Sequence, residues 1–193
     1  MASTLFALAM SLLPTQFQRS APTLETERLV LRGFYRDDLD AHAATLSDPE
    51  VMRHLGGTPT SREDSWRKLM MAVGQWPLLG FGYWAVESKA DGRMIGQAGL
   101  CDFERGLTPD MSGLPEMGWI FDRSVHGRGI AGEACRAVLD WAGRALAPSP
   151  IWSIISPDNL PSLKLAERLG FEHVTLSEYH GEAIAILKRP KQS

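Results

Sequence analysis

Residues Glu116–Cys135 read EMGWIFDRSVHGRGIAGEAC, and the rest of the sequence can be understood outward from them. The aromatic and β-branched run Met117–Phe121 predicts a strand. Small and apolar residues then recur at helical spacing over Ala131–Ala142, which predicts a helix. A glycine-rich turn at the start of a helix leaves backbone N–H groups without partners, and Arg128 adds a guanidinium beside them. The stretch therefore indicates a binding site for an anion, most naturally a phosphate.

The glycines of this stretch allow more than one interpretation. The run Gly127–Gly132, GRGIAG, fits the G-x-G-x-x-G dinucleotide fingerprint, although that pattern alone is a weak signal. In a dinucleotide fold the first glycine ends the strand, whereas here the segment Asp122–His126 intervenes. The dinucleotide fold also has an acidic residue after a later strand. Asp158, which follows the strand-like run IWSII, is the candidate here, but it comes later in the chain than that residue normally does. A glycine-rich helix start that binds no ligand is a third interpretation.

Composition places the chain among ordinary globular proteins of one domain. Of its 193 residues, 44% are hydrophobic and 22% are charged, and the net charge is −3. That charge argues against a nucleic-acid partner. Cys101 and Cys135 lie among apolar residues without metal-ligand spacing, so we expect buried free thiols, no bound metal and a reducing, cytoplasmic compartment.

The first residues are treated separately from the domain. The apolar run Leu5–Leu13 has no basic residue before it, unlike a secretory signal, and it is too short to span a bilayer. We interpret residues 1–22 as an N-terminal extension and residues 23–193 as one domain, with no membrane partner. The extension either packs on the domain or mediates self-association, which makes a homodimer one expectation.

The first half of the chain predicts a strand, helices and then a run of strands. Alternating residues over Thr26–Phe34 predict a half-buried strand, and helical spacing follows Asp37 and Asp38. Asp48-Pro49 predicts a short helix. A longer helix is expected from Arg62 to about Gln75, with its buried face formed by Trp66, Leu69, Met70 and Val73. Three strand-like runs come next, YWAVES, RMIGQAGLCDF and EMGWIF, and the turn Asp91-Gly92 between the first two favours an antiparallel meander.

The second half predicts one crossover and a final hairpin. After the glycine-rich helix, the run IWSII predicts a strand, followed by a helix over Pro161–Leu169 that ends at Gly170. A hairpin with its turn near His180-Gly181 ends the chain. This order of elements predicts an α+β fold whose mostly antiparallel sheet contains one right-handed β-α-β crossover.

Three separated stretches resemble one family, the GNAT N-acetyltransferases, in the branch of the ribosomal-protein N-terminal acetyltransferases. TERLVLR with DPEVMRHL is similar to the start of that branch, and EMGWIF…HGRGIAGEA is similar to its central strand and pyrophosphate loop. SPDNLPSLKLAERLGFEHV is similar to its later segment, which carries an Asn, a Ser three residues on, leucines and a Gly-Phe pair. The resemblance covers roughly residues 24–188, and His126 departs from the Gln or Arg that usually begins the loop.

The resemblance implies transfer of an acetyl group from acetyl-CoA to an amine in a ternary complex. In the family the pantetheine arm lies in a gap beside the central strand and the pyrophosphate lies on the loop. The positions that would contact acetyl-CoA are Trp119, Ile120, Phe121, His126, Gly127, Arg128, Gly129, Ile130, Ala131, Gly132, Asn159 and Ser162.

Two residues are candidates for proton transfer. An amine must lose a proton to attack a thioester, and Glu116 at the start of the central strand is the candidate base. Its alternative role is a solvent-facing carboxylate. Ser162 is the candidate acid for the leaving thiolate, and its alternative is a hydroxyl that bonds the backbone of its own helix. A backbone N–H of Trp119 or Ile120 is expected to stabilise the tetrahedral intermediate.

The sequence therefore leaves three alternative functions. The leading one is an acetyl-CoA-dependent N-acetyltransferase that acts on a protein N-terminus or a small amine. A catalytically silent acyl-CoA-binding protein would keep the glycine loop but need neither Glu116 nor Ser162. An NAD-dependent oxidoreductase is the third, and binding of a nicotinamide cofactor would support it.

Overall fold

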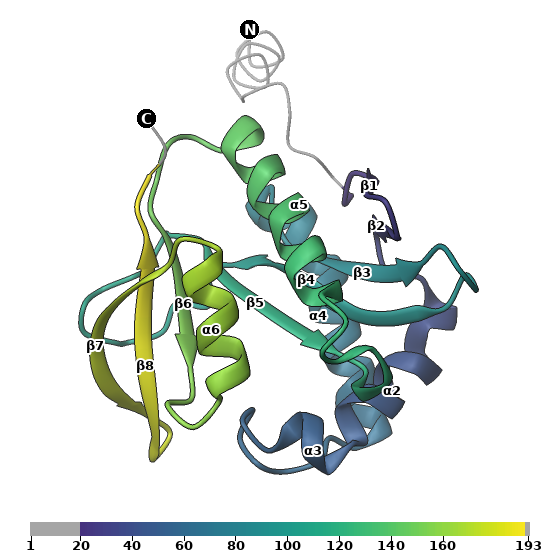
Figure 1. Cartoon of the computed structure of the whole chain (residues 1–193), viewed down its shortest axis with the longest axis horizontal. Helices are drawn as coiled ribbons and strands as arrows, with labels where there is room; N and C mark the ends of the chain where they lie inside the picture. The colour runs from purple at the N-terminus through teal and green to yellow at the C-terminus, as the bar shows by residue number, and fades with distance from the viewer. Residues whose placement is uncertain (1–19, 192–193) are drawn as a thin grey trace, which may run out of the picture.

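An eight-stranded sheet forms the centre of the protein (Figure 1). The computed structural model describes residues 20–191. The strand order is β1-β2-β3-β4-β5-β6-β8-β7, and every neighbouring pair is antiparallel except β5 with β6. This confirms the α+β fold with one parallel crossover. The strands are β1 (Leu24–Glu25), β2 (Leu29–Arg32), β3 (Tyr83–Ser88), β4 (Met94–Cys101), β5 (Glu116–Phe121), β6 (Ile151–Ile155), β7 (Glu172–Tyr179) and β8 (Glu182–Arg189).

Helices cover both faces of the sheet. In Figure 1, α5 and α6 lie in front of the sheet, and α2 and α4 lie behind it. The helices are η1 (Arg36–Asp38), α2 (Leu39–Ser47), α3 (Pro49–Met52), α4 (Arg62–Leu79), η2 (Arg123–Val125), α5 (Ile130–Ala145) and α6 (Leu160–Arg168). Within residues 20–191, no helix is long and apolar enough to cross a membrane.

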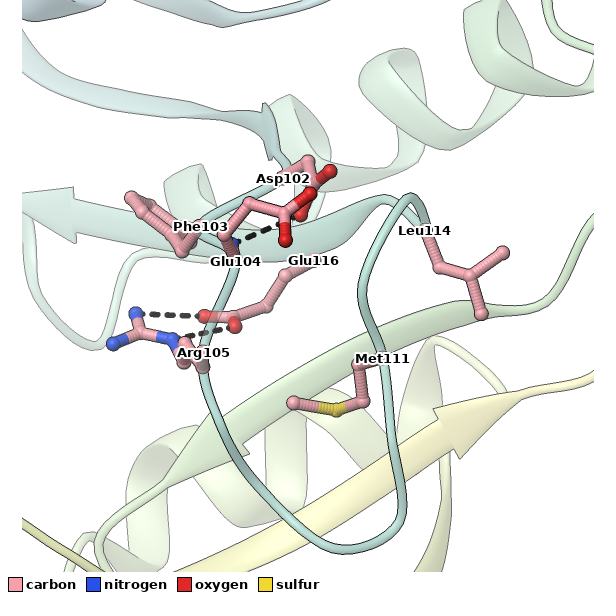
Figure 2. A pocket seen from close by; sticks show the side chains of 7 residues that line it. All are labelled: Asp102, Phe103, Glu104, Arg105, Met111, Leu114 and Glu116. Atoms are coloured by element: carbon pink, nitrogen blue, oxygen red, sulfur yellow. Dashed lines mark hydrogen bonds and ion pairs between the residues drawn. The ribbon is translucent and has the colours of Figure 1, made fainter.

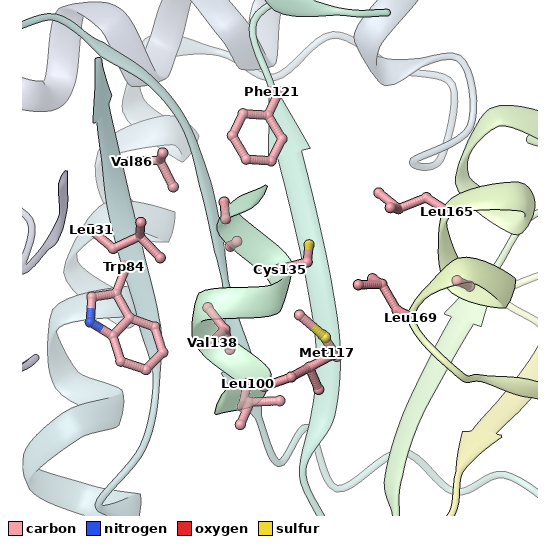
Figure 3. Packing of buried hydrophobic residues seen from close by; sticks show 14 of the residues in the cluster. Leu31, Trp84, Val86, Leu100, Met117, Phe121, Cys135, Val138, Leu165 and Leu169 are labelled. Atoms are coloured by element: carbon pink, nitrogen blue, oxygen red, sulfur yellow. The ribbon is translucent and has the colours of Figure 1, made fainter. Parts of the chain in front are cut away.

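The main core lies between the sheet and α5. Cys135 and Val138 of α5 are fully buried beside Met117 and Leu100 of the strands (Figure 3). Three tryptophans join α4, β3 and α5, with ring centroids 4.6 Å apart for Trp76 and Trp84 and 5.0 Å apart for Trp84 and Trp141. Edge-to-face pairs of this kind add stability beyond the area that they bury. Trp76 and Trp84 are therefore core residues.

The expected buried face of α4 is wrong in part. Met70 and Val73 are each 46% exposed, and Trp66 is half-buried, whereas Leu69 is buried as expected. The buried side is Ser65, Leu69, Ala72, Gln75 and Trp76. Burial of the large Trp76 ring against two other tryptophans fixes the rotation of the helix. The helix also continues past Gln75 and includes Pro77 before it ends at Gly80, whose φ is +77°.

The turns behave as the sequence predicts. β3 and β4 pair through the Asp91-Gly92 turn, and β7 and β8 pair through a two-residue turn in which His180 and Gly181 both have positive φ. The expected strand over Thr26–Phe34 is shorter, since only Leu29–Arg32 forms β2. Of the N-terminal extension, residues 1–19 lie outside the described residues. Pro22 O accepts a hydrogen bond of 2.7 Å from Trp84 Nε1.

Candidate active site

The two parallel strands part almost where they meet. β5 and β6 are in register at a single position, Glu116 opposite Trp152, and Trp152 N donates to Pro115 O at 2.9 Å. Beyond this point the strands diverge, as Figure 1 shows. Among the strands of residues 20–191, the rest of β5 therefore has a neighbour, β4, on one side only.

The backbone of β5 points alternate groups into the gap between the strands. The buried Ser153 of β6 donates from Oγ to Met117 O at 3.0 Å, so the polar groups of Met117 face β6. Backbone groups alternate along a strand, so those of Trp119 and Phe121 face the gap as well, and those of Ile120 face β4. The gap thus offers the N–H of Trp119 in preference to that of Ile120.

A loop with two left-handed glycines follows β5. The φ angles of Gly127 and Gly129 are +70° and +76°, a conformation that glycine adopts without steric cost. His126 Nε2 lies 3.0 Å from Phe121 O and closes the loop onto the end of the strand. Asp122 Oδ1 accepts from Ser124 N at 2.8 Å and forms the first turn.

Six consecutive backbone amides of this loop lack partners. Within residues 20–191, the N–H groups of residues 127–132 donate to no acceptor. The first helical residue of α5 is Ile130, so the positive end of the helix dipole lies behind these amides. The side chain of Arg128 is exposed and forms no ion pair within the described part of the chain. Such a row of amides at a helix start is suited to an oxyanion, and phosphate is the common case.

An ion pair that sequence patterns do not predict holds this loop. Arg28 Nε lies 2.6 Å from Glu133 Oε2, and Arg28 Nη1 donates to Arg128 O at 2.9 Å. Thr26 Oγ1 donates to Glu133 Oε1 at 2.5 Å. Burial alone would raise the pKa of Glu133, but the hydrogen bonds from Thr26 and Arg28 outweigh it and lower that pKa. No local pattern could reveal this contact, because Arg28 and Glu133 are 105 positions apart.

Helix α6 packs beside the start of α5. A Cβ on Gly132 would lie 3.4 Å from Leu165 Cδ1 of α6, so the helices are in contact there. Asn159 is the N-cap of α6, and its Oδ1 accepts from Ser162 N at 3.2 Å. The hydroxyl of Ser162 has no hydrogen-bond partner within residues 20–191. The expected alternative, a hydroxyl bonded to its own helix backbone, is therefore not what the structure shows.

Glu116 is buried and paired, not solvent-facing. Arg105 Nε lies 2.7 Å from Glu116 Oε2, and Arg105 Nη2 lies 3.0 Å from Oε1 (Figure 2). The side chains of Arg105 and Glu116 are 16% and 8% exposed. Burial raises the pKa of Glu116, and the guanidinium of Arg105 offsets part of that rise. The carboxylate is thus fixed in direction at the point where β5 and β6 part.

The loop that carries Arg105 folds onto the sheet. Its Met111 is buried with Trp152, Ile184 and Ile186. Residues 102–115 therefore cover the face of β6 and β8 that is turned away from α6. The Arg105 guanidinium lies over the ring of Phe103 at 4.4 Å and over the ring of Tyr179 at 4.7 Å. Sequence patterns do not single out Arg105, because its contacts depend on the way in which this loop folds back.

A family model described as "Acetyltransferase (GNAT) domain" matches residues 28–172. The chain belongs to the GNAT acetyltransferase family. Among curated relatives, the uncharacterized N-acetyltransferase p20 of Bacillus licheniformis is 29% identical over 151 residues, which are 78% of this chain and 82% of that protein. Membership of the family makes the chain an acyltransferase.

Solved acetyltransferase structures agree with this assignment. An acetyltransferase from Agrobacterium tumefaciens is 30% identical, with a TM-score of 0.73 over 87% of this chain and 94% of that one. The ribosomal-protein-S5-alanine acetyltransferase of Vibrio fischeri has a TM-score of 0.68 over 89% of this chain and 97% of that one. Its identity is 19%, so this second likeness is one of fold.

The GNAT fold also separates the alternatives for the glycine loop. Dinucleotide-binding folds use a mostly parallel sheet, whereas this sheet has one parallel pair.

The two cysteines are free and buried, as expected. Burial raises the pKa of Cys101 to about 12 and also raises that of Cys135, so both thiols stay protonated at neutral pH. Neither has the thiolate character of a nucleophile.

Proposed function

We propose that the protein transfers an acetyl group from acetyl-CoA to a primary amine, by direct attack within a ternary complex. The observation that carries the proposal is the row of unpartnered amides over residues 127–132, which opens beside the gap between β5 and β6. A phosphate group and an extended arm attached to it would need these two features next to each other.

The same residues suggest how the donor binds. The amides of residues 127–132 and the Arg128 side chain would hold the pyrophosphate. The pantetheine arm would lie against Trp119, Ile120 and Phe121, where the gap-facing N–H groups resemble the free edge of a sheet. The side-chain amide of Asn159 and the hydroxyl of Ser162 would face the arm from the start of α6.

Chemistry at the thioester would then use three groups. The Trp119 N–H would stabilise the negative charge that develops on the carbonyl oxygen. Glu116 would accept the proton that the attacking amine must lose, with Arg105 holding its direction. The Ser162 hydroxyl would donate to the departing thiolate. No covalent enzyme intermediate is required, since orientation of two bound substrates supplies much of the acceleration.

The acceptor divides into two classes. A protein N-terminus is suggested by the similar Vibrio fischeri protein, whose name specifies a ribosomal protein and its alanine. A small amine is the other class. Both present a primary amine, and peptides with N-terminal alanine or serine can be compared directly with small amines in the same assay.

The proposal is tested by calorimetric titration with acetyl-CoA, with NAD as a parallel control. Saturable binding of acetyl-CoA alone, followed by thiol release in the presence of an amine, would support it. Binding without release of thiol for any acceptor would favour the silent acyl-CoA-binding function. Binding of neither ligand would mean that the glycine loop is structural. The two free thiols fit a reducing compartment, and we infer that the reaction occurs in the cytoplasm.

A further inference from the structure

The ring of Tyr83 lies across two neighbouring strands. In the register of the sheet, Tyr83 of β3 faces Gly99 of β4, and Gly99 faces Gly118 of β5. A Cβ on Gly99 would collide with Tyr83 Cα and would lie 2.9 Å from its Cγ. A Cβ on Gly118 would collide with the tyrosine hydroxyl. Glycine within a strand often marks a close approach by another group, and here two glycines make room for one aromatic ring.

Two buried side chains of α4 hold the backbone of Tyr83. Gln75 Oε1 accepts from Tyr83 N at 3.1 Å, and Trp76 Nε1 donates to Tyr83 O at 3.0 Å. Gln75 and Trp76 are 5% and 2% exposed, so both bonds are shielded from water. A side chain supported in this way stays close to one position, as a group that orients a substrate must.

The hydroxyl of Tyr83 makes no hydrogen bond in the described part of the chain. Within residues 20–191 it has no hydrogen-bond partner, and the residue is only half-buried. Buried tyrosine hydroxyls usually find a partner. Burial, and then the negative charge of Glu116, raise the pKa of Tyr83, so that the hydroxyl stays protonated in the neutral range. The structure thus presents a free, protonated hydroxyl at a fixed place.

That place adjoins the groups assigned to acetyl transfer. Positions two apart on a strand share a face, so the hydroxyl over Gly118 and the carboxylate of Glu116 lie on the same face of β5. Trp84, the next residue after Tyr83, packs with α5, so this shared face is the one away from α5. The N–H of Trp119, which faces the gap, belongs to the residue directly after Gly118.

We propose that the Tyr83 hydroxyl contacts the attacking nitrogen of the acceptor amine. The proposal rests on the proposed function. The hydroxyl oxygen accepts a hydrogen bond from the uncharged amine and so directs the nitrogen lone pair at the thioester carbon. In the transfer a C–N bond forms and the C–S bond breaks, and the proton lost by the amine balances the proton gained by the thiolate. Tyr83 itself neither gains nor loses a proton.

The test is Tyr83→Phe, which removes the hydroxyl and keeps the ring in its place. We expect the rate of transfer at subsaturating acceptor to fall roughly 10-fold or more, as expected for the loss of one orienting hydrogen bond. Affinity for acetyl-CoA, measured by calorimetry, should not change. Tyr35→Phe is the matched control, because Tyr35 is 61% exposed and remote in sequence from Gly99 and Gly118.

A second variant approaches the same hydroxyl from β5. Gly118→Ala places a methyl group where the hydroxyl lies, so it should also slow transfer. In the Tyr83→Phe background the same change should add little, because the group that it displaces is already gone. If the wild type is active and Tyr83→Phe is equally active, the role of Tyr83 is overturned and the proposed function stands. Absence of transfer by the wild type would instead overturn the proposed function, so the two failures are distinct.

Discussion

Arg105 holds both carboxylate oxygens of Glu116, with Nε 2.7 Å from Oε2 and Nη2 3.0 Å from Oε1. Two parallel bonds fix the plane of the carboxylate as well as its position. The pair lies at the start of β5, where the gap between β5 and β6 opens. If Glu116 is the base, it must accept a proton while it is still bonded to the Arg105 guanidinium. The guanidinium favours the ionised carboxylate, whereas burial favours the neutral form.

Glu116→Gln tests the proton-accepting role. We expect a rate loss of about 10² to 10⁴-fold, with unchanged affinity for acetyl-CoA, because an amide cannot accept the proton. If Glu116 is the base, its ionised form is the one that accepts the proton, so the wild-type rate should rise with pH through its pKa. That rise should be absent in the variant. Glu104→Gln is the control, since Glu104 precedes Arg105 in the same loop but is exposed. A wild-type rate in Glu116→Gln would remove Glu116 from the mechanism.

Arg105→Met tests the cost of an unpaired buried carboxylate. The variant should be less stable at pH 8 by about 3 kcal/mol, measured by urea unfolding. Without Arg105 the pKa of folded Glu116 is raised further above its unfolded value, so the folded state loses stability as pH rises through that range. The loss should therefore be smaller at pH 5. Arg53→Met, which breaks an exposed pair, should cost less than about 0.5 kcal/mol at either pH.

Gly129→Glu tests the anion site. Its φ of +76° strains any other residue, by about 1 to 2 kcal/mol, and a carboxylate there would repel phosphate. We expect calorimetry to show acetyl-CoA affinity reduced by more than about 100-fold. Gly181→Glu is the matched control, because its φ is +81° in the turn between β7 and β8, with open space around it. Equal affinities of the two variants would contradict the loop assignment.

Ser162→Ala tests the proton-donating role proposed for this residue. The hydroxyl has no described partner, so its removal should change the free energy of unfolding by less than about 0.5 kcal/mol. If it donates to the leaving thiolate, the rate of transfer should fall while acetyl-CoA still binds. Asn159→Ala is an informative companion, since it removes the cap of α6 and should cost about 1 kcal/mol. An unchanged rate in Ser162→Ala would leave the thiolate to another donor.

Local sequence patterns are enough to predict most of the helices and strands of the fold. Leu29 and Leu31 alternate with Arg28, Val30 and Arg32, and both leucines are fully buried in β2. Gly170 ends α6 with a φ of +83°, as its place after a helical run predicts. Helical spacing alone predicts part of the wrong face for α4, because Met70 and Trp76 are both apolar and the spacing does not decide which of them meets the core. Contact of Trp76 with Trp84 and Trp141 decides it.

The sequence by itself determined the order of the elements, the glycine loop at the start of α5 and the place of Asn159 and Ser162 after β6. These follow from periodicity, from the φ angles that only glycine adopts freely and from short-range capping. Only the tertiary structure decided that Arg28 holds Glu133, that Arg105 holds Glu116 and that Tyr83 reaches Gly118. These contacts join residues that are 105, 11 and 35 positions apart, and no local preference encodes a contact made by strand register and loop packing.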